Sequence, residues 1–107
     1  VGSSEISSMK PASVLINVGR GPVVEEAALV DALKEKRILG AALDVFDEEP
    51  LPAGHAFYDL ENVLLSPHCA DMTPGWLDDS MRFFLKNYGR FRAGAVLENL
   101  VNKELGY

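Results

Sequence analysis

The fold is decided by the stretch SVLINVGRGPVV at residues 13–24, where an apolar run meets a glycine pair. Residues 13–18 are apolar or β-branched at nearly every position, and Gly19 closes the run. A strand that is apolar on both faces is typical of a parallel sheet that is covered on both sides. The stretch therefore predicts a buried parallel strand that ends in a turn.

A helix is predicted directly after this turn, over residues 25–37. Leu29, Val30 and Leu33 place apolar side chains at positions i, i+1 and i+4, which lie on one face of a helix. Acidic residues begin the segment and basic residues end it, which complements the helix dipole. Gly40 follows, and we expect it to stop the helix in a left-handed conformation.

Two further apolar runs, AALDVF at residues 41–46 and NVLLS at residues 62–66, predict a second and a third strand. The acidic, proline-containing residues 47–54 between them predict a loop, and residues 3–10 predict a short helical turn ended by Pro11. Strand, helix, strand, loop and strand in this order predict an α/β fold with parallel pairing.

A long amphipathic helix is predicted over residues 74–92. Thr73 is its expected cap, Pro74 fits its first position, and Gly94 is expected to end it. The apolar stripe on this helix is wide and aromatic, and three strands are not expected to cover it.

Composition limits the classes of partner. The 107 residues are 48% hydrophobic and 24% charged, which is typical of one globular domain or part of one. A net charge of −6 disfavours nucleic acid and anionic membranes, and no apolar run is long enough to cross a bilayer. The single cysteine, Cys69, does not indicate a disulfide-stapled secreted domain. We therefore expect a cytoplasmic protein, and because the chain begins with Val1 we expect that its natural N-terminus lies upstream.

Polar residues follow each predicted strand, where ligands bind in open α/β sheets. Arg20 stands between two glycines after the first strand, and its forked guanidinium suits a carboxylate. The full dinucleotide pattern Gly-x-Gly-x-x-Gly fails because Val24 stands at the third glycine position, so a tight turn and a phosphate site both remain open.

The second and third strand ends supply carboxylates and an imidazole. His68 is either a general acid/base or a polar residue satisfied at a strand end, and Glu49 could pair with it and favour its protonated form. Asp44 either faces a ligand or accepts hydrogen bonds from loop amides. Metal binding by His55, His68 and Asp71 matches none of the strong ligand spacings, so no metal site is predicted.

Read in order, three motifs resemble a known family. They are NVGRGPVV at residues 17–24, GAALDVFDEEPLP at residues 40–52 and SPH at residues 66–68, and together they resemble the C-terminal half of D-isomer-specific 2-hydroxyacid dehydrogenases. Asn99, Val101 and the final Gly106 and Tyr107 are similar to the family's terminus. The resemblance implies a partial Rossmann-type parallel sheet with flanking helices.

The resemblance also implies roles for individual residues. Arg20 is implied to bind the substrate carboxylate, His68 to exchange a proton with the substrate oxygen, and Glu49 to orient His68. Asp44 is implied to lie near the nicotinamide amide. The positions implied to bind the cofactor, NAD or NADP, are Val18, Gly19, Arg20, Asp44, His68 and Ala70.

Division of the chain follows from the same resemblance. Residues 1–73 are expected to form the C-terminal half of a dinucleotide-binding domain, and residues 74–107 a helix and tail that pack on a substrate domain absent from these 107 residues. The implied substrate is a small 2-keto or 2-hydroxy acid such as glyoxylate or hydroxypyruvate. The complete protein is expected to be a homodimer, and this fragment alone is expected to be inactive because the pyrophosphate-binding turn lies upstream in the family.

Two other interpretations of these residues compete with catalysis. Some members of the family bind dinucleotide as sensing modules, but the presence of Arg20, Glu49 and His68 together favours an enzyme. A phosphoacceptor receiver domain built on Asp44 needs a lysine after its last strand, and none lies between Lys36 and Lys86.

Overall fold

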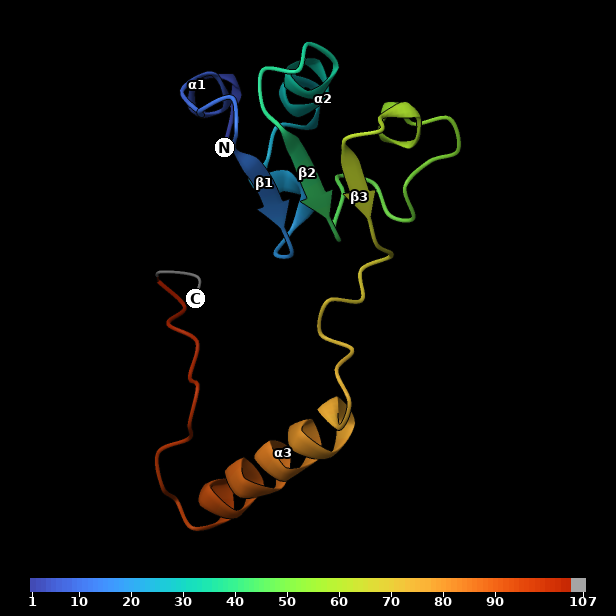
Figure 1. Cartoon of the computed structure of the whole chain (residues 1–107). Helices are drawn as coiled ribbons and strands as arrows, with labels where there is room; N and C mark the ends of the chain where they lie inside the picture. The colour runs from blue at the N-terminus through green and yellow to red at the C-terminus, as the bar shows by residue number, and fades with distance from the viewer. Residues whose placement is uncertain (105–107) are drawn as a thin grey trace. The chain divides into compact units, whose positions relative to one another are not determined.

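A computed structural model describes residues 1–104 of the chain, which forms two compact units that divide after Ala70. The first unit contains a three-stranded parallel sheet whose spatial order, β1-β2-β3, follows the chain (Figure 1). Its strands are β1 (Val14–Asn17), β2 (Gly40–Leu43) and β3 (Val63–Leu65). The predicted α/β fold with parallel pairing is confirmed.

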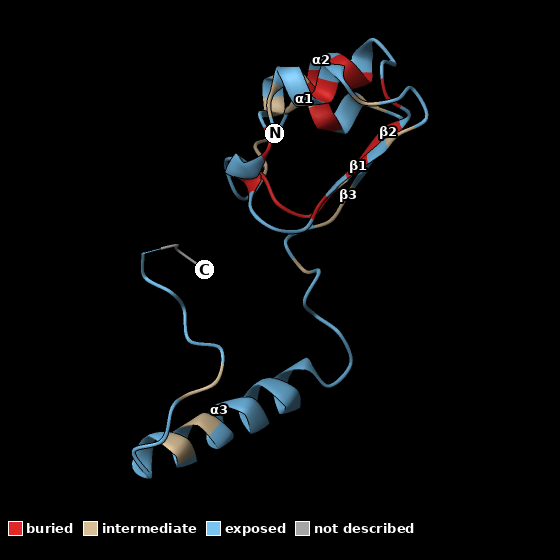
Figure 2. Cartoon of the chain, turned by 90° about the vertical axis from the view of Figure 1, so that its left-hand side faces the viewer, coloured by how far each residue is buried: buried red, intermediate tan, exposed pale blue. Residues whose placement is uncertain are grey.

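Two α-helices and two short 3-10 helices complete the first unit. They are α1 (Ser3–Ser7), η1 (Gly21–Val23), α2 (Glu26–Lys34) and η2 (Ala56–Asp59). Buried residues gather where α2 faces the sheet (Figure 2). The fully buried side chains there include Ile6, Leu29, Leu33, Ile38 and Phe57. Apolar burial on this face stabilises the packing of α2 on the sheet, because it is the main favourable contribution to the free energy of folding.

The opposite face of the sheet is not covered by other residues of the first unit. Val14, Ile16 and Leu64 are 49%, 68% and 71% exposed. Residues 1–70 therefore cover one face of the sheet that the sequence predicts to be covered on both. The sequence of β1 is apolar on both faces, but α1 and α2 pack against only one of them (Figure 2).

Gly40 begins β2 and does not end α2, so the predicted left-handed stop at Gly40 was wrong. The helix ends at Lys34, and the left-handed residue after it is Lys36, with φ 54°. A Cβ on Gly40 would lie 2.6 Å from the carbonyl oxygen of Asn62, which accepts a hydrogen bond from the Ala41 amide. Glycine is required here because β2 and the chain leading into β3 approach closely.

The second unit, described from Asp71 to Glu104, is built on α3 (Trp76–Arg92). Its N-terminal cap is Gly75 in a left-handed conformation, with φ 84° and no side-chain hydrogen bond. The prediction that Thr73 caps this helix and Pro74 opens it was therefore wrong: the Thr73 carbonyl accepts the Trp76 amide in a turn that precedes the helix. The predicted end is confirmed, since Gly94 is left-handed with φ 66°.

None of the residues of α3 is buried. The predicted terminal residues Gly106 and Tyr107 lie outside the described residues. Within residues 1–104, no helix has both the length and the apolar character that a membrane span requires.

Candidate active site

The Gly19–Arg20–Gly21 segment after β1 is a tight turn shaped by a buried asparagine. Asn17, which is 7% exposed, accepts a hydrogen bond from the Gly19 amide at 3.1 Å and donates one to the Arg20 carbonyl at 3.0 Å. A Cβ on Gly21 would lie 2.0 Å from backbone atoms of Phe46, so only glycine fits there. This contact brings the turn after β1 against the chain that leaves β2, and it leaves the Arg20 side chain exposed.

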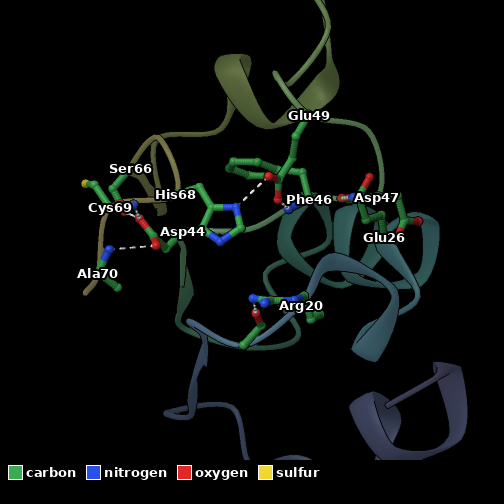
Figure 3. Close-up of polar contacts among 11 residues, drawn as sticks. Arg20, Glu26, Asp44, Phe46, Asp47, Glu49, Ser66, His68, Cys69 and Ala70 are labelled. Carbon is green, nitrogen blue, oxygen red and sulfur yellow. Dashed lines mark hydrogen bonds and ion pairs between the residues drawn. The ribbon is translucent and has the colours of Figure 1, made fainter. Parts of the chain in front are cut away.

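Glu49 and His68 form a hydrogen-bonded pair across the ends of β2 and β3. The distance from His68 Nδ1 to Glu49 Oε2 is 2.6 Å, and the Phe46 amide donates to Glu49 Oε1 at 3.0 Å (Figure 3). These two hydrogen bonds lower the pKa of Glu49, with the His68 bond as the larger cause, so this carboxylate is ionised at neutral pH. An ionised carboxylate only accepts, so Nδ1 of His68 carries the proton and Nε2 is left for exchange with a ligand.

Arg20 lies within electrostatic reach of this pair. Its positive charge is among the causes that lower the pKa of Glu49. Figure 3 shows Arg20, Glu49 and His68 coming from three separate segments of the chain, which follow β1, β2 and β3. The guanidinium Nη1 donates to the carbonyl of Gly19 at 2.7 Å, which leaves its other donors for a ligand. Arg20, Glu49 and His68 thus place a cation, a carboxylate and an imidazole at one edge of the sheet.

An open, largely apolar pocket lies beside Glu49 and His68, with a volume of about 530 Å³. Its other lining residues are Phe46, Pro50, Leu51, Tyr58, Leu65, Ser66 and Pro67. Arg20 is not part of this lining. The roles implied by the family resemblance group Arg20, Glu49 and His68 around one substrate. The structure brings the three side chains to one edge of the sheet, but of the three only Glu49 and His68 line this cavity.

Asp44 is 2% exposed and directs its carboxylate toward the segment that follows β3. Its Oδ1 accepts from the Ser66 hydroxyl at 2.5 Å and from the Cys69 amide at 2.9 Å, and its Oδ2 accepts from the Ala70 amide at 2.9 Å. Led by the Ser66 bond, these contacts lower the pKa of Asp44 to about 2. Of the two possibilities that the sequence left open, the structure has Asp44 bonded to loop amides.

The remaining predicted cofactor positions lie at the same strand ends. Val18 is 61% exposed directly after β1, next to Gly19, and Ala70 closes the first unit. The resemblance implies that Val18 and Ala70 contact the cofactor through their backbone atoms. Such contacts require an accessible backbone, which Val18 has at the exposed end of β1.

Sequence analysis gave no role to two residues that shape the site, Asn17 and Ser66. An asparagine at the end of a strand whose side chain can bond the backbone two residues on is typical of a side-chain turn, so Asn17 carried a local signal. Ser66 carried none, because its partner Asp44 is 22 residues away.

A second histidine–carboxylate pair supports the loop after β2. Glu26 Oε1 accepts from the Asp47 amide at 2.8 Å, and Glu26 Oε2 lies 3.5 Å from His55 Nε2. The His55 ring also contacts the Phe57 ring, with centroids 4.8 Å apart. No three His, Cys, Asp or Glu side chains among residues 1–104 lie where they could share a metal ion.

The family model for "D-isomer specific 2-hydroxyacid dehydrogenase, NAD binding domain" matches residues 1–70. Among curated proteins, the chain is 42% identical over 105 residues to the glyoxylate reductase of Thermococcus gammatolerans, covering 98% of this chain and 31% of that protein. It is also 42% identical over 105 residues to the glyoxylate/hydroxypyruvate reductase B of Enterobacter agglomerans, covering 98% and 32%.

Solved structures of similar proteins contain nicotinamide cofactors. A D-isomer specific 2-hydroxyacid dehydrogenase from Xanthobacter autotrophicus Py2, in complex with NADPH and MES, matches with a TM-score of 0.89 at 37% identity, over 98% of this chain and 43% of that one. An NADPH-dependent glyoxylate/hydroxypyruvate reductase from Sinorhizobium meliloti, in complex with NADP and sulfate, matches with a TM-score of 0.88 at 32% identity, over 99% and 34%. The chain spans about a third of the length of the curated relatives it matches.

Proposed function

Since the chain belongs to the D-isomer specific 2-hydroxyacid dehydrogenase family, we propose that the whole protein transfers a hydride between a nicotinamide cofactor and a small D-2-hydroxy acid or its 2-keto acid. The observation that carries this proposal is the 2.6 Å contact between His68 Nδ1 and Glu49 Oε2, within electrostatic reach of Arg20. When a nicotinamide cofactor supplies the hydride, reduction of a 2-keto acid needs a proton donor and a group that binds the substrate carboxylate. His68 with Glu49, and Arg20, offer these groups at one edge of the sheet.

His68 is the proposed general acid and base. Glu49 holds the proton on Nδ1, so Nε2 faces the substrate: in its protonated form it gives a proton to the carbonyl oxygen during reduction, and in its neutral form it takes that proton back during oxidation. Glu49 stabilises the imidazolium that this exchange creates. Proton transfer by a positioned side chain contributes about 10²–10⁴-fold to rate.

Arg20 is the proposed binding group for the substrate carboxylate. Its guanidinium offers paired donors that match a carboxylate in geometry and charge. Binding at Arg20 would present the neighbouring carbonyl to His68, since both side chains lie at the carboxyl edge of the sheet. Glyoxylate and hydroxypyruvate are the substrates to test first, because they name the reductases that this chain resembles.

The strand ends fit the reacting end of NAD or NADP. When bound, the cofactor supplies or accepts the hydride. Val18, Gly19 and Ala70 would line it through backbone, with Arg20 and His68 beside its nicotinamide end. The imidazole, carboxylate and guanidinium groups at this edge fit hydride transfer to a 2-keto acid, because that reaction needs a proton donor and a group that binds the substrate carboxylate. The 107 residues do not contain a Gly-x-Gly-x-x-Gly turn for the pyrophosphate, so the chain supplies only part of the site.

Residues 1–73 are proposed as the C-terminal half of a dinucleotide-binding domain and residues 74–107 as a helix and tail that pack on a substrate domain. Exposure of the apolar residues of α3 supports the second assignment. The complete protein is proposed to be a cytoplasmic homodimer, and these 107 residues alone are proposed to be inactive.

The test is turnover by the natural chain that contains these residues, with NADH or NADPH and glyoxylate or hydroxypyruvate. His68→Gln is expected to lower kcat by about 10²–10⁴-fold. The matched control is His55→Gln, the same change at the other histidine, which is expected to leave kcat close to wild type. Cofactor binding without turnover of any 2-keto acid would contradict the proposal and would instead support a dinucleotide-sensing module.

A further inference from the structure

We propose that Asp44 is a positioning residue for His68: its buried carboxylate holds the segment Ser66–Ala70 in the conformation that directs the His68 imidazole to Glu49. The consequence for catalysis rests on the proposed function, whereas the orientation of His68 can be tested without it. In this arrangement Asp44 acts through its hydrogen bonds to residues on both sides of His68, which are the Ser66 hydroxyl and the amides of Cys69 and Ala70.

The hydrogen bonds of Asp44 surround His68 in the sequence. Ser66, two residues before His68, donates its hydroxyl, and Cys69 and Ala70, the two residues after it, donate their amides. One carboxylate at the end of β2 thus fixes the chain before and after His68, as the dashed lines in Figure 3 show. The pair Glu49–His68 links the same two strand ends a second time.

His68 needs such support because of its backbone conformation. Its φ of 51° lies in the left-handed region, which is unfavourable for a residue with a Cβ. Such a conformation persists only where the surroundings fix it. The three hydrogen bonds to Asp44 supply that constraint directly at the neighbouring residues.

The negative charge of Asp44 is essential to this role. All three partners are donors, and the ionised carboxylate accepts on both of its oxygens and carries no donor hydrogen of its own. Its pKa of about 2 keeps the group ionised throughout the neutral range. In Asp44→Asn, the amide NH2 would face a backbone or hydroxyl donor, and at least one of the three hydrogen bonds would be lost.

This role differs from the direct cofactor contact that the family resemblance implies for Asp44. A cofactor contact predicts that Asp44→Asn weakens binding of NAD or NADP and leaves His68 as it is in the cofactor-free protein. A positioning role predicts that Asp44→Asn changes His68 in the cofactor-free protein and leaves binding of NAD or NADP nearly unchanged. With Asp44 only 2% exposed and three acceptor positions in use, we expect the second pattern.

The experiment measures the imidazole nitrogens of His68 by ¹⁵N NMR in the cofactor-free natural chain, with the signals assigned by His68→Gln. In wild type, at a pH where the ring is neutral, we expect a single tautomer with the proton on Nδ1. In Asp44→Asn we expect a mixture of the two tautomers. Asp31→Asn is the matched control, because it makes the same change at an exposed aspartate of α2 and is expected to leave the tautomer unchanged.

Ser66→Ala is a second, milder variant in case Asp44→Asn does not fold. It removes one of the three donors and is expected to shift the His68 tautomer in the same direction by less. In the enzyme assay, Asp44→Asn is expected to lower kcat by about 10²-fold, the scale of a small misplacement of a reacting group, with the cofactor Kd changed by less than about threefold.

A single Nδ1–H tautomer that persists in both Asp44→Asn and Ser66→Ala would overturn the proposal, as would a tenfold weaker cofactor Kd with an unchanged kcat at saturating cofactor. If wild type turns over no 2-keto acid, the proposed function fails. The tautomer comparison still decides the role of Asp44 in that case, because it needs neither cofactor nor substrate.

Discussion

The two units of this chain contain similar apolar material but bury it differently. In the first unit, α2 and the sheet enclose a core that includes Leu29, Leu33 and Phe57, each at most 1% exposed. In the second unit, α3 carries an aromatic stripe, yet Phe84 is 61% and Phe91 70% exposed. An apolar stripe is therefore enough to specify a helix, whereas stability depends on what the stripe packs against.

The polar side of α3, by contrast, has partners within its own unit. Glu98 in the tail lies 2.8 Å from Lys86 Nζ, and its amide donates to the side chain of Asn87 at 2.8 Å. Arg90 Nε donates to the Val96 carbonyl at 2.6 Å. The tail is thus tied to α3 by polar contacts while the aromatic residues stay exposed. This is the pattern expected of a helix whose apolar face packs on another domain, as proposed above.

The largest difference between the units is expected in the free energy of unfolding that is lost when one phenylalanine in each unit is truncated to alanine. Phe57→Ala removes a fully buried ring and is expected to lower the free energy of unfolding by about 3–5 kcal/mol. Phe84→Ala, the same change at an exposed site, is expected to change it by less than about 0.5 kcal/mol. Urea denaturation of the 107-residue chain measures both. Equal losses would show that α3 has a packing partner within this chain.

A smaller contrast, opposite in sign, is expected from one glycine in each unit. Gly21→Ala places a Cβ 2.0 Å from the backbone of Phe46, which cannot move aside cheaply, and is expected to destabilise by about 1–3 kcal/mol. Gly89→Ala meets nothing within 4 Å and lies inside α3, so it is expected to stabilise this helix by about 0.5–1 kcal/mol.

Thermal denaturation followed by circular dichroism tests this pair. A neutral Gly21→Ala would mean that the turn after β1 can move away from Phe46. In that case the close approach described for this turn is not required for folding.

The smallest expected effect is on the acid sensitivity of the two units. The pKa of Asp44 is about 2 in the folded chain and 3.8 without the fold, so its ionised form stabilises the first unit above pH 3.8. That contribution is lost as the pH falls from 3.8 toward 2. The stability difference between wild type and Asp44→Asn should therefore narrow over this range.

Glu98 provides the comparison in the second unit. Its pKa is lowered chiefly by the hydrogen bond with Lys86, so its contribution is also lost on acidification. Because Lys86 is exposed and Glu98 is only partly buried, added salt should reduce this contribution more than that of Asp44, which is 2% exposed. Amide hydrogen exchange in β2 and α3, measured at two salt concentrations, distinguishes the units. An equal response to salt would contradict the difference in burial.

The sequence by itself determined the elements and their order. The run at residues 13–18 predicted β1, and the spacing of Leu29, Val30 and Leu33 predicted α2. Parallel pairing followed from the order of elements, because crossovers through helices favour it. The sequence also predicted that Arg20 and His68 follow strand ends and that Glu49 lies in the loop after the second strand. These features depend on local conformational preference and on side-chain periodicity. Both are determined by residues that are close together in the sequence.

Other features were decided only by the tertiary structure. Gly40 serves a close approach to Asn62, 22 residues away, and Asp44 finds its partners at Ser66, Cys69 and Ala70. The face of the sheet against which α1 and α2 pack was likewise decided by the tertiary structure. Hydrogen bonds and close packing between distant segments depend on which atoms meet after folding. A local pattern of residues does not specify which distant residue will become a neighbour.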